Sequence, residues 1–191
     1  YCVPGESYIA TLDALFDARD SIRVVTCRQE GGAANMADAY GKMTGRPGVC
    51  FVTRGPGATN ASVGIHTAFQ DSTPVVLFIG QVARSMSERE AFQEIDFRRM
   101  LGELTKWTGQ IDDPTRIPEY VNRAFRTAVS GRPGPVALAS DHGGFELKEA
   151  LEAYLKGRGY AVLAFDGFAF GSRRVRLGDV PERIRGDLPP T

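Results

Sequence analysis

Residues 48–60 read Gly48-Val49-Cys50-Phe51-Val52-Thr53-Arg54-Gly55-Pro56-Gly57-Ala58-Thr59-Asn60. The first six residues form an apolar, β-branched run of the kind found in buried strands. The Gly-Pro-Gly segment after them predicts a tight turn over residues 54–60, which leads into a helix that extends to about Phe69. A buried strand that passes directly into a helix is the repeating unit of a parallel α/β sheet.

Similar units lie on both sides of this stretch. On the carboxyl side, residues 74–81 predict a second strand, residues 117–130 show helical periodicity, and residues 135–140 predict another strand. On the amino side, the β-branched residues of 22–25 predict a strand that precedes a glycine-opened helix. We therefore predict an α/β domain over residues 1–140, with a parallel sheet and helices on both faces.

Glu30 lies at the junction between the predicted strand at 22–25 and the helix that follows it. In parallel α/β sheets, ligands bind at the carboxyl ends of the strands. A carboxylate at such a junction is therefore either a chemical reagent or a group that stabilises the start of the helix. The residues themselves leave both interpretations open.

The composition is that of an ordinary soluble α/β protein. The 191 residues are 42% hydrophobic and 24% charged, and 23 basic residues balance 23 acidic ones. Zero net charge gives no indication of a nucleic-acid or anionic-membrane partner, and no apolar run is long enough to span a membrane. Cys2, Cys27 and Cys50 are widely spaced, so we predict no disulfide framework and no zinc site, and we expect the cytoplasm as the compartment.

Several short segments, taken in order, carry a more specific signal. They are residues 3–7, 28–30, 34–45, 48–60, 71–74, 80–82 and 91–94. Together they resemble the pyrimidine-binding domain of thiamine-diphosphate enzymes, in the branch that includes acetolactate synthase, and the resemblance extends from residue 1 to about 140. It implies the thiamine-diphosphate-binding fold and a transferase or lyase that acts on a 2-keto acid, whose identity the sequence does not reveal.

The resemblance also implies a role for Glu30. In these enzymes a glutamate hydrogen-bonds the pyrimidine ring nitrogen of thiamine diphosphate, and this favours the tautomer that removes the thiazolium proton. The task calls for a carboxyl group buried against apolar neighbours, because burial raises its pKa. With the resemblance included, we expect Glu30 to be catalytic and cofactor-binding rather than only a helix-start group.

Five further positions match the cofactor-binding surface of the family, each with a plainer alternative. Pro4 and Gly5 match a loop near the pyrimidine ring, where the backbone must approach closely, yet Gly5 could simply form a turn. Gly55, Pro56 and Asn60 match a helix start beside the cofactor, although glycine and proline would serve any tight connection equally well.

Two other positions match a loop that lies over the reacting carbon on the partner subunit. These are Phe92 and Gln93, within an Ala-Phe-Gln-Glu segment, and an ordinary loop with one buried aromatic is an equal alternative. Lys106 matches a position near the substrate entrance in some relatives, but we expect an exposed, solvated lysine. We expect His66 to be packed or exposed on a helix rather than catalytic.

We expect the chain to be a fragment or a fusion that is inactive alone. It begins at Tyr1, directly on what should be the first strand, and it contains no Gly-Asp-Gly…Asn magnesium motif. Mg²⁺ would therefore enter only through a diphosphate-binding domain that these residues lack, and we predict no metal ligand among them. The expected partner is a second copy of the chain or such a domain.

Residues 136–166 resemble a second family, the opening strand-helix-strand of ribose-5-phosphate isomerase B. The resemblance implies that Asp141 and His142 contact a sugar phosphate, and it predicts a helix-strand unit over 141–166 before a loosely ordered tail over 167–191. No cysteine follows Cys50 to serve as the proton-transferring base, and Asp141 could instead be a helix N-cap. A non-catalytic, self-associating domain is a third hypothesis.

Overall fold

The computed structural model describes residues 1–17 and 19–141. Within them, a four-stranded sheet has the order β1-β2-β4-β3, and all neighbouring strands are parallel. The strands are β1 (Gly48–Thr53), β2 (Val75–Gly80), β3 (Trp107–Ile111) and β4 (Pro135–Ser140). The predicted parallel sheet is confirmed, and β1, β2 and β4 lie where the sequence placed strands. The sequence did not indicate β3, which pairs only with β4 at an edge of the sheet.

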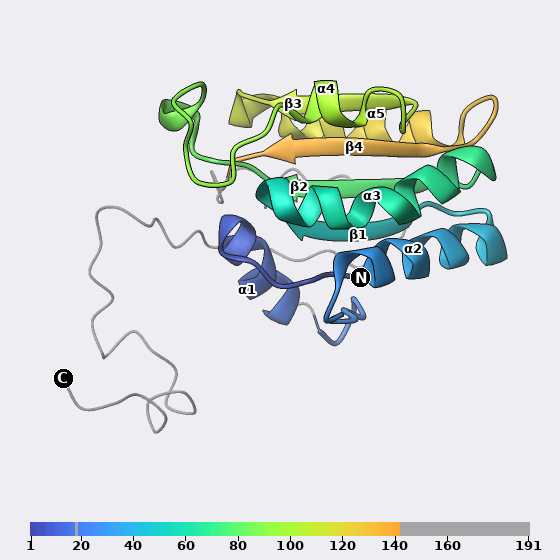
Figure 1. Cartoon of the computed structure of the whole chain (residues 1–191). Helices are drawn as coiled ribbons and strands as arrows, with labels where there is room; N and C mark the ends of the chain where they lie inside the picture. Colours follow the sequence, from blue (N-terminus) through green and yellow to red (C-terminus); the bar gives the residue numbers. More distant parts are fainter. Residues whose placement is uncertain (18, 142–191) are drawn as a thin grey trace.

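Three helices cover one face of the sheet. They are α2 (Glu30–Thr44), α3 (Arg54–Gln70) and the short α4 (Phe97–Leu101), which lie in front of the strands in Figure 1. Their apolar side chains form one core with every second residue of the central strands, including Cys50, Leu77 and Ala137. Burying every second strand residue on one face is the pattern that the pleat of a β-sheet imposes.

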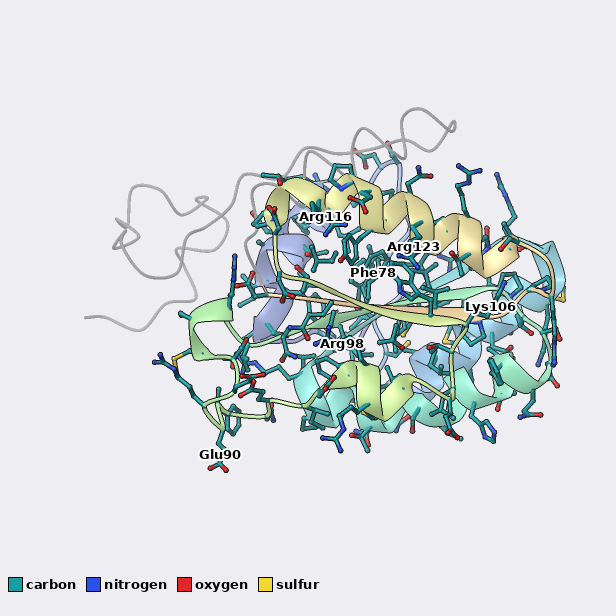
Figure 2. All side chains as sticks on the ribbon, turned by 90° about the horizontal axis from the view of Figure 1, so that it is seen from above. Phe78, Glu90, Arg98, Lys106, Arg116 and Arg123 are labelled. Carbon is teal, nitrogen blue, oxygen red and sulfur yellow. The ribbon has the colours of Figure 1, made fainter. Side chains whose placement is uncertain are left out.

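The opposite face packs against α5 (Ile117–Val129), which lies behind the sheet in Figure 1. A second core joins Val121 and Ala124 of α5 to Val76 and Phe78 of β2. In Figure 2 the sheet is seen nearly edge-on, and Phe78 lies between the strands and α5. Helices on both faces are therefore confirmed, and the predicted helix over 117–130 corresponds to α5.

The predicted strand at residues 22–25 is wrong. This segment contains no ladder, and its only pairing is an isolated bridge between Thr26 and Cys2, which in turn bridges Phe51 of β1. The β-branched side chains are only half-buried, because no further strand of the described chain lies outside them. The amino-terminal segment instead continues through a 3-10 turn, η1 (Glu6–Tyr8), into the helix α1 (Ile9–Asp17).

Two local predictions also need correction. The segment 54–60 is not a separate turn but the beginning of α3, where Pro56 is tolerated because the first backbone N–H groups of a helix need no partner inside it. Lys106 is not a solvated surface lysine, since its Nζ donates to the carbonyls of Thr127 and Ser130 at the end of α5, at 2.5 and 2.6 Å. Desolvation lowers the pKa of Lys106.

Two short 3-10 turns complete the described elements, η2 (Arg84–Met86) after β2 and η3 (Pro114–Arg116) before α5. The expected helix-strand unit after Asp141 and the expected tail over 167–191 lie outside the described residues. Among the helices of residues 1–17 and 19–141, none is long and apolar enough to cross a membrane.

Candidate functional site

The predicted site residues gather at the carboxyl ends of β1 and β2, where α2 and α3 begin. Glu30 is the first residue of α2. Gln29 caps this helix, because its side-chain oxygen accepts a hydrogen bond from the backbone N–H of Gly32 at 2.9 Å. The capping role that Glu30 could have filled is thus taken by its neighbour, which leaves the Glu30 carboxylate available for another contact.

That contact comes from α3. The Asn60 side-chain nitrogen donates to Oε2 of Glu30 at 3.0 Å, across 30 positions of sequence. Glu30 is half-buried rather than enclosed, which differs from the expected dry environment, and Asn60 is exposed. The hydrogen bond itself is exposed, so a planar, hydrogen-bonding ring could reach the Glu30 carboxylate.

The groups behind Glu30 are strongly desolvated. Burial raises the pKa of the Cys50 thiol to about 12 and raises that of the Tyr8 hydroxyl well above its usual range. The negative charge of Glu30 is the smallest of the contributions that raise these two pKa values. Burial, rather than the charge of Glu30, therefore dominates the pKa of both groups.

The predicted amino-terminal loop lies against the same end of β1. A Cβ atom on Gly5 would lie only 2.4 Å from Cβ of Thr53, so this position requires glycine for close approach. The hydroxyls of Ser7 and Thr53 are hydrogen-bonded at 2.5 Å and hold the loop in place. Pro4 is exposed beside it. Gly5 thus packs closely on β1, and the approach of this loop to the pyrimidine ring stays a prediction.

The remaining predicted residues meet at the start of α3. The Gly55 backbone N–H donates to the carbonyl of Gln93 at 2.9 Å, and a Cβ on Gly55 would lie 2.7 Å from Ile95. The alternative interpretation, an ordinary loop with one buried aromatic, required Phe92 to be buried. Phe92 is instead 72% exposed. Pro56 is exposed as well. The loop that carries Phe92 and Gln93 thus packs its backbone on α3 and leaves the aromatic ring outside.

Sequence reasoning missed an ion pair at this edge. Nη1 of Arg54 lies 2.5 Å from Oε1 of Glu6, across 48 positions of sequence. The spacing gave no signal for this contact, because the pair depends on the amino-terminal loop folding over the end of β1. It joins two segments that were each predicted to border the site.

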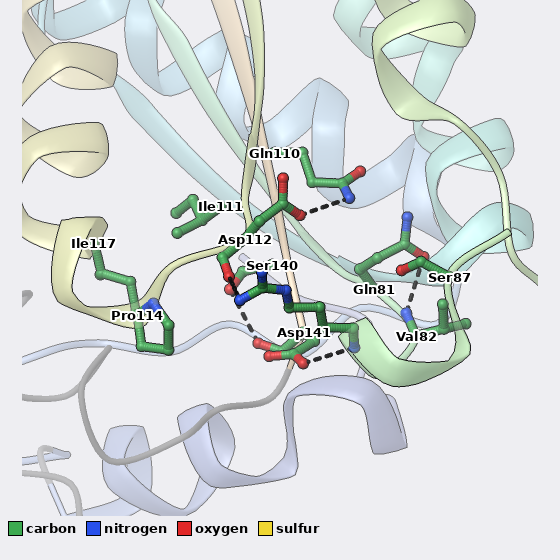
Figure 3. A pocket seen from close by; sticks show the side chains of 11 residues that line it. Gln81, Val82, Ser87, Gln110, Ile111, Asp112, Pro114, Ile117, Ser140 and Asp141 are labelled. Atoms are coloured by element: carbon green, nitrogen blue, oxygen red, sulfur yellow. Dashed lines mark hydrogen bonds between the residues drawn. The ribbon is translucent and has the colours of Figure 1, made fainter.

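A cavity of about 160 Å³ lies farther along the same edge of the sheet, at the ends of β2, β4 and β3 (Figure 3). Its polar lining includes Gln81, Arg84, Gln110, Asp112, Ser140 and Asp141. The carboxylate of Asp141 accepts a hydrogen bond from the backbone N–H of Arg84 at 3.0 Å. The cavity does not include Glu30 or Asn60. His142, the expected companion of Asp141, lies outside the described residues.

The cysteines and the metal-binding side-chain types of the described residues can be located directly. Cys2, Cys27 and Cys50 are all free. No group of three or more His, Cys, Asp or Glu side chains within residues 1–17 and 19–141 could hold a metal ion. His66 is exposed on α3, with its Nε2 3.5 Å from the side-chain nitrogen of Gln70.

Comparison with known proteins agrees with this geometry. Residues 1–100 match the family described as "Thiamine pyrophosphate enzyme, N-terminal TPP binding domain". The chain is 44% identical over 135 residues to a probable acetolactate synthase large subunit of Methanocaldococcus jannaschii, which covers 71% of this chain and 22% of that protein.

Two further relatives give the same picture. The chain is 41% identical over 135 residues to the mitochondrial acetolactate synthase catalytic subunit of Saccharomyces cerevisiae, and 40% identical over 136 residues to the acetolactate synthase large subunit of Corynebacterium glutamicum. Each alignment covers 71% of this chain, with 20% of the first protein and 22% of the second. The chain thus spans about a fifth of the length of these relatives.

Proposed function

The chain belongs to the thiamine pyrophosphate enzymes, as their N-terminal TPP-binding domain, and from that premise we propose that it forms the pyrimidine-binding half of an acetolactate-synthase-like enzyme. The proposed reaction class is a transferase or lyase reaction on a 2-keto acid. The proposed cofactor is thiamine diphosphate, with Mg²⁺ held by a separate diphosphate-binding domain.

The observation that carries this proposal is the hydrogen bond between Asn60 and Glu30. It holds a half-buried carboxylate, in an exposed hydrogen bond, at the edge of the sheet where α/β proteins bind ligands. A carboxylate oxygen can accept from, or share a proton with, a ring nitrogen. The residues present therefore fit the pyrimidine end of thiamine diphosphate, which supplies the electron sink for the reaction when it is bound.

The chain's own residues would then have separate tasks. Glu30 would hold a proton at the pyrimidine nitrogen, and Asn60 would fix the orientation of the Glu30 carboxylate. Gly5 and Gly55 would let the segments that border the site pack closely on Thr53 and Ile95. Phe92 and Gln93 would border the reacting carbon and restrict access of water to it.

A partner is needed to close this site, because Glu30 is only half-buried in the described chain. Exposed apolar side chains lie on the two helices that carry the site. They are Met36, Tyr40 and Met43 of α2 and Val63 of α3. Burial of such side chains favours association, so this surface supports pairing with a diphosphate-binding domain, either in a homo-oligomer or in a separate subunit.

Isothermal titration tests the proposal. Thiamine diphosphate with Mg²⁺ is titrated into the chain alone and into a mixture with a diphosphate-binding domain from a homologous acetolactate synthase. We expect binding only in the mixture, and we expect Glu30→Gln to weaken it. Glu119→Gln, a matched change on the exposed start of α5, should bind as the unmodified chain does. Equal binding by Glu30→Gln would overturn the proposal.

The two other hypotheses predict different results. A non-catalytic, self-associating domain would assemble with itself and bind no cofactor in either titration. A sugar-phosphate isomerase would bind ribose-5-phosphate and lose that binding in Asp141→Asn. Nothing in the described residues favours the isomerase, because the Asp141 carboxylate is engaged by the Arg84 backbone and no described cysteine lies near it in sequence.

A further inference from the structure

Arg54 has a backbone conformation that is costly for its residue type. Its φ is +45°, in the left-handed region, although it begins α3 and carries a long side chain. Residues other than glycine destabilise the chain in this region, because Cβ lies too close to the backbone. Such strain persists where the surrounding structure requires it, and it is concentrated at functional sites. The strained backbone of Arg54 therefore suggests that its side chain has a specific role.

The guanidinium of Arg54 lies between two predicted site segments. It pairs with Glu6 at 2.5 Å on one side, and its Cζ lies 5.9 Å from the centre of the Phe92 ring on the other, within the range of a cation–π contact. The Arg54 side chain is only 15% exposed, whereas that of Glu6 is 66% exposed. Its Nε is buried and has no hydrogen-bond partner within the described residues. The cation is thus held in place at an energetic cost.

The backbone of the Phe92 loop is fixed by other residues. The carboxylate of Glu94 accepts from the backbone N–H groups of Glu88 and Ala91 at 2.6 and 3.1 Å. Three residues of this loop, Glu88, Glu90 and Gln93, have positive φ. Figure 2 shows Glu90 pointing away from the body of the protein at the end of the loop.

The base of the loop is held as well, because Gln81 donates from its amide to the carbonyl of Ile95 at 3.1 Å. None of these hydrogen bonds involves the side chain of Phe92, which is 72% exposed, so they leave its side-chain torsions unrestrained. A separate contact is needed to orient that ring.

We propose that Arg54 is a positioning residue: its guanidinium, held by Glu6, orients the exposed Phe92 ring beside the start of α3. The importance of Arg54 for catalysis rests on the proposed function, since only the proposed function puts the Phe92 ring beside the reacting carbon. The orientation of the ring by Arg54 does not depend on the proposed function. The proposal explains why a strained backbone position carries arginine where glycine would fit without strain.

The orientation is tested on the 191-residue chain by ¹⁹F NMR with 4-fluorophenylalanine at position 92. Arg54→Gly should move the resonance toward that of free 4-fluorophenylalanine. The same variant should keep or raise the midpoint of denaturation, because glycine relieves the left-handed strain. Arg54→Lys should restore part of the shift. Arg89→Ala, which removes an exposed cation from the same loop, should leave the resonance unchanged.

Two results would overturn the proposal. One is an unchanged resonance in Arg54→Gly. The other is a lowered denaturation midpoint in this variant, which would make Arg54 a structural residue. If Arg54→Gly does not fold, Glu6→Gln decides, because it releases the guanidinium without changing the strained backbone and should also shift the resonance.

A second measurement separates this inference from the proposed function. In a mixture that binds cofactor, Arg54→Gly should lower kcat/KM for a 2-keto acid at least fivefold while the affinity for thiamine diphosphate stays the same. Failure of the unmodified mixture to bind cofactor would contradict the proposed function and leave the ¹⁹F result standing. An unchanged kcat/KM in a cofactor-binding mixture would contradict the positioning role.

Discussion

Gly64 of α3 lies against Ala34 of α2 so closely that a Cβ atom on Gly64 would be 2.6 Å from the Ala34 Cβ and 2.9 Å from the Ala34 backbone. This close approach lets the two helices lie side by side across one face of the sheet. It also brings the first turn of α2 next to the second turn of α3, where Asn60 reaches Glu30. The packing of two small residues therefore helps to assemble the candidate site.

Gly64→Ala should destabilise the protein by about 1–3 kcal/mol, because the added methyl group meets backbone that cannot move independently. Gly32→Ala is the matched control, since its Cβ would meet nothing within 4 Å and alanine should stabilise the helix by about 0.5–1 kcal/mol. Chemical denaturation measures both changes. Equal effects of the two substitutions would show that α2 and α3 are not in close contact at Gly64.

The three thiols should react in two classes. Burial raises the pKa of Cys2 and raises that of Cys50 to about 12, so these thiols are protonated and inaccessible near pH 8. Cys27 is half-buried, with its sulfur 3.7 Å from that of Met36. A thiol reagent should therefore modify one cysteine in the native chain and three after denaturation, with no native reaction in Cys27→Ser. Rapid modification of Cys50 in the native chain would contradict its burial in β1.

Acid should weaken the start of α5 in a defined way. Hydrogen bonds from Thr115 lower the pKa of Asp113, and a hydrogen bond from Arg116 lowers that of Glu119. A lowered folded-state pKa gives stability that is present above the ordinary values of 3.8 and 4.5 and is lost as the pH falls through the lowered values.

The double variant Asp113→Asn, Glu119→Gln should therefore show a shallower loss of stability between about pH 5 and pH 2 than the unmodified chain. Denaturation midpoints across this range measure the difference. Both groups are exposed, so the effect should be small and should decrease in high salt. Identical pH profiles for the double variant and the unmodified chain would mean that neither the Arg116–Glu119 ion pair nor the Asp113 cap forms in solution.

The central strands and α5 could be predicted because their signals are local. Buried parallel strands require continuous apolar runs, as in β2, and an amphipathic helix repeats its apolar residues at 3.6-residue spacing, as in α5. The edge strand β3 could not be predicted, because it has no such run and exists through its pairing with β4. The segment at 22–25 has the opposite combination. Its β-branched composition is that of a strand, but no ladder of the described sheet includes it, so the composition alone gave a wrong prediction.

The sequence named candidate residues for the site but could not indicate the contacts between them. Glu30 and Asn60 were each identified as candidates, yet their hydrogen bond follows from the packing of α2 on α3, which no spacing in the sequence reveals. The Glu6–Arg54 ion pair has the same origin. The half-buried state of Glu30 was not foreseen either, because the burial of a single carboxylate depends on which neighbouring surfaces cover it.

The central claim is that Glu30 controls a proton of the bound cofactor, and the exchange rate of the thiazolium C2 proton for deuterium measures this most directly. The measurement uses rapid-quench NMR on thiamine diphosphate bound to the chain and a diphosphate-binding domain together. Glu30→Gln should slow exchange by about 10²–10⁴-fold, and Glu119→Gln should not change it. Exchange in Glu30→Gln at the rate of the unmodified complex, with cofactor bound equally well, would contradict the account.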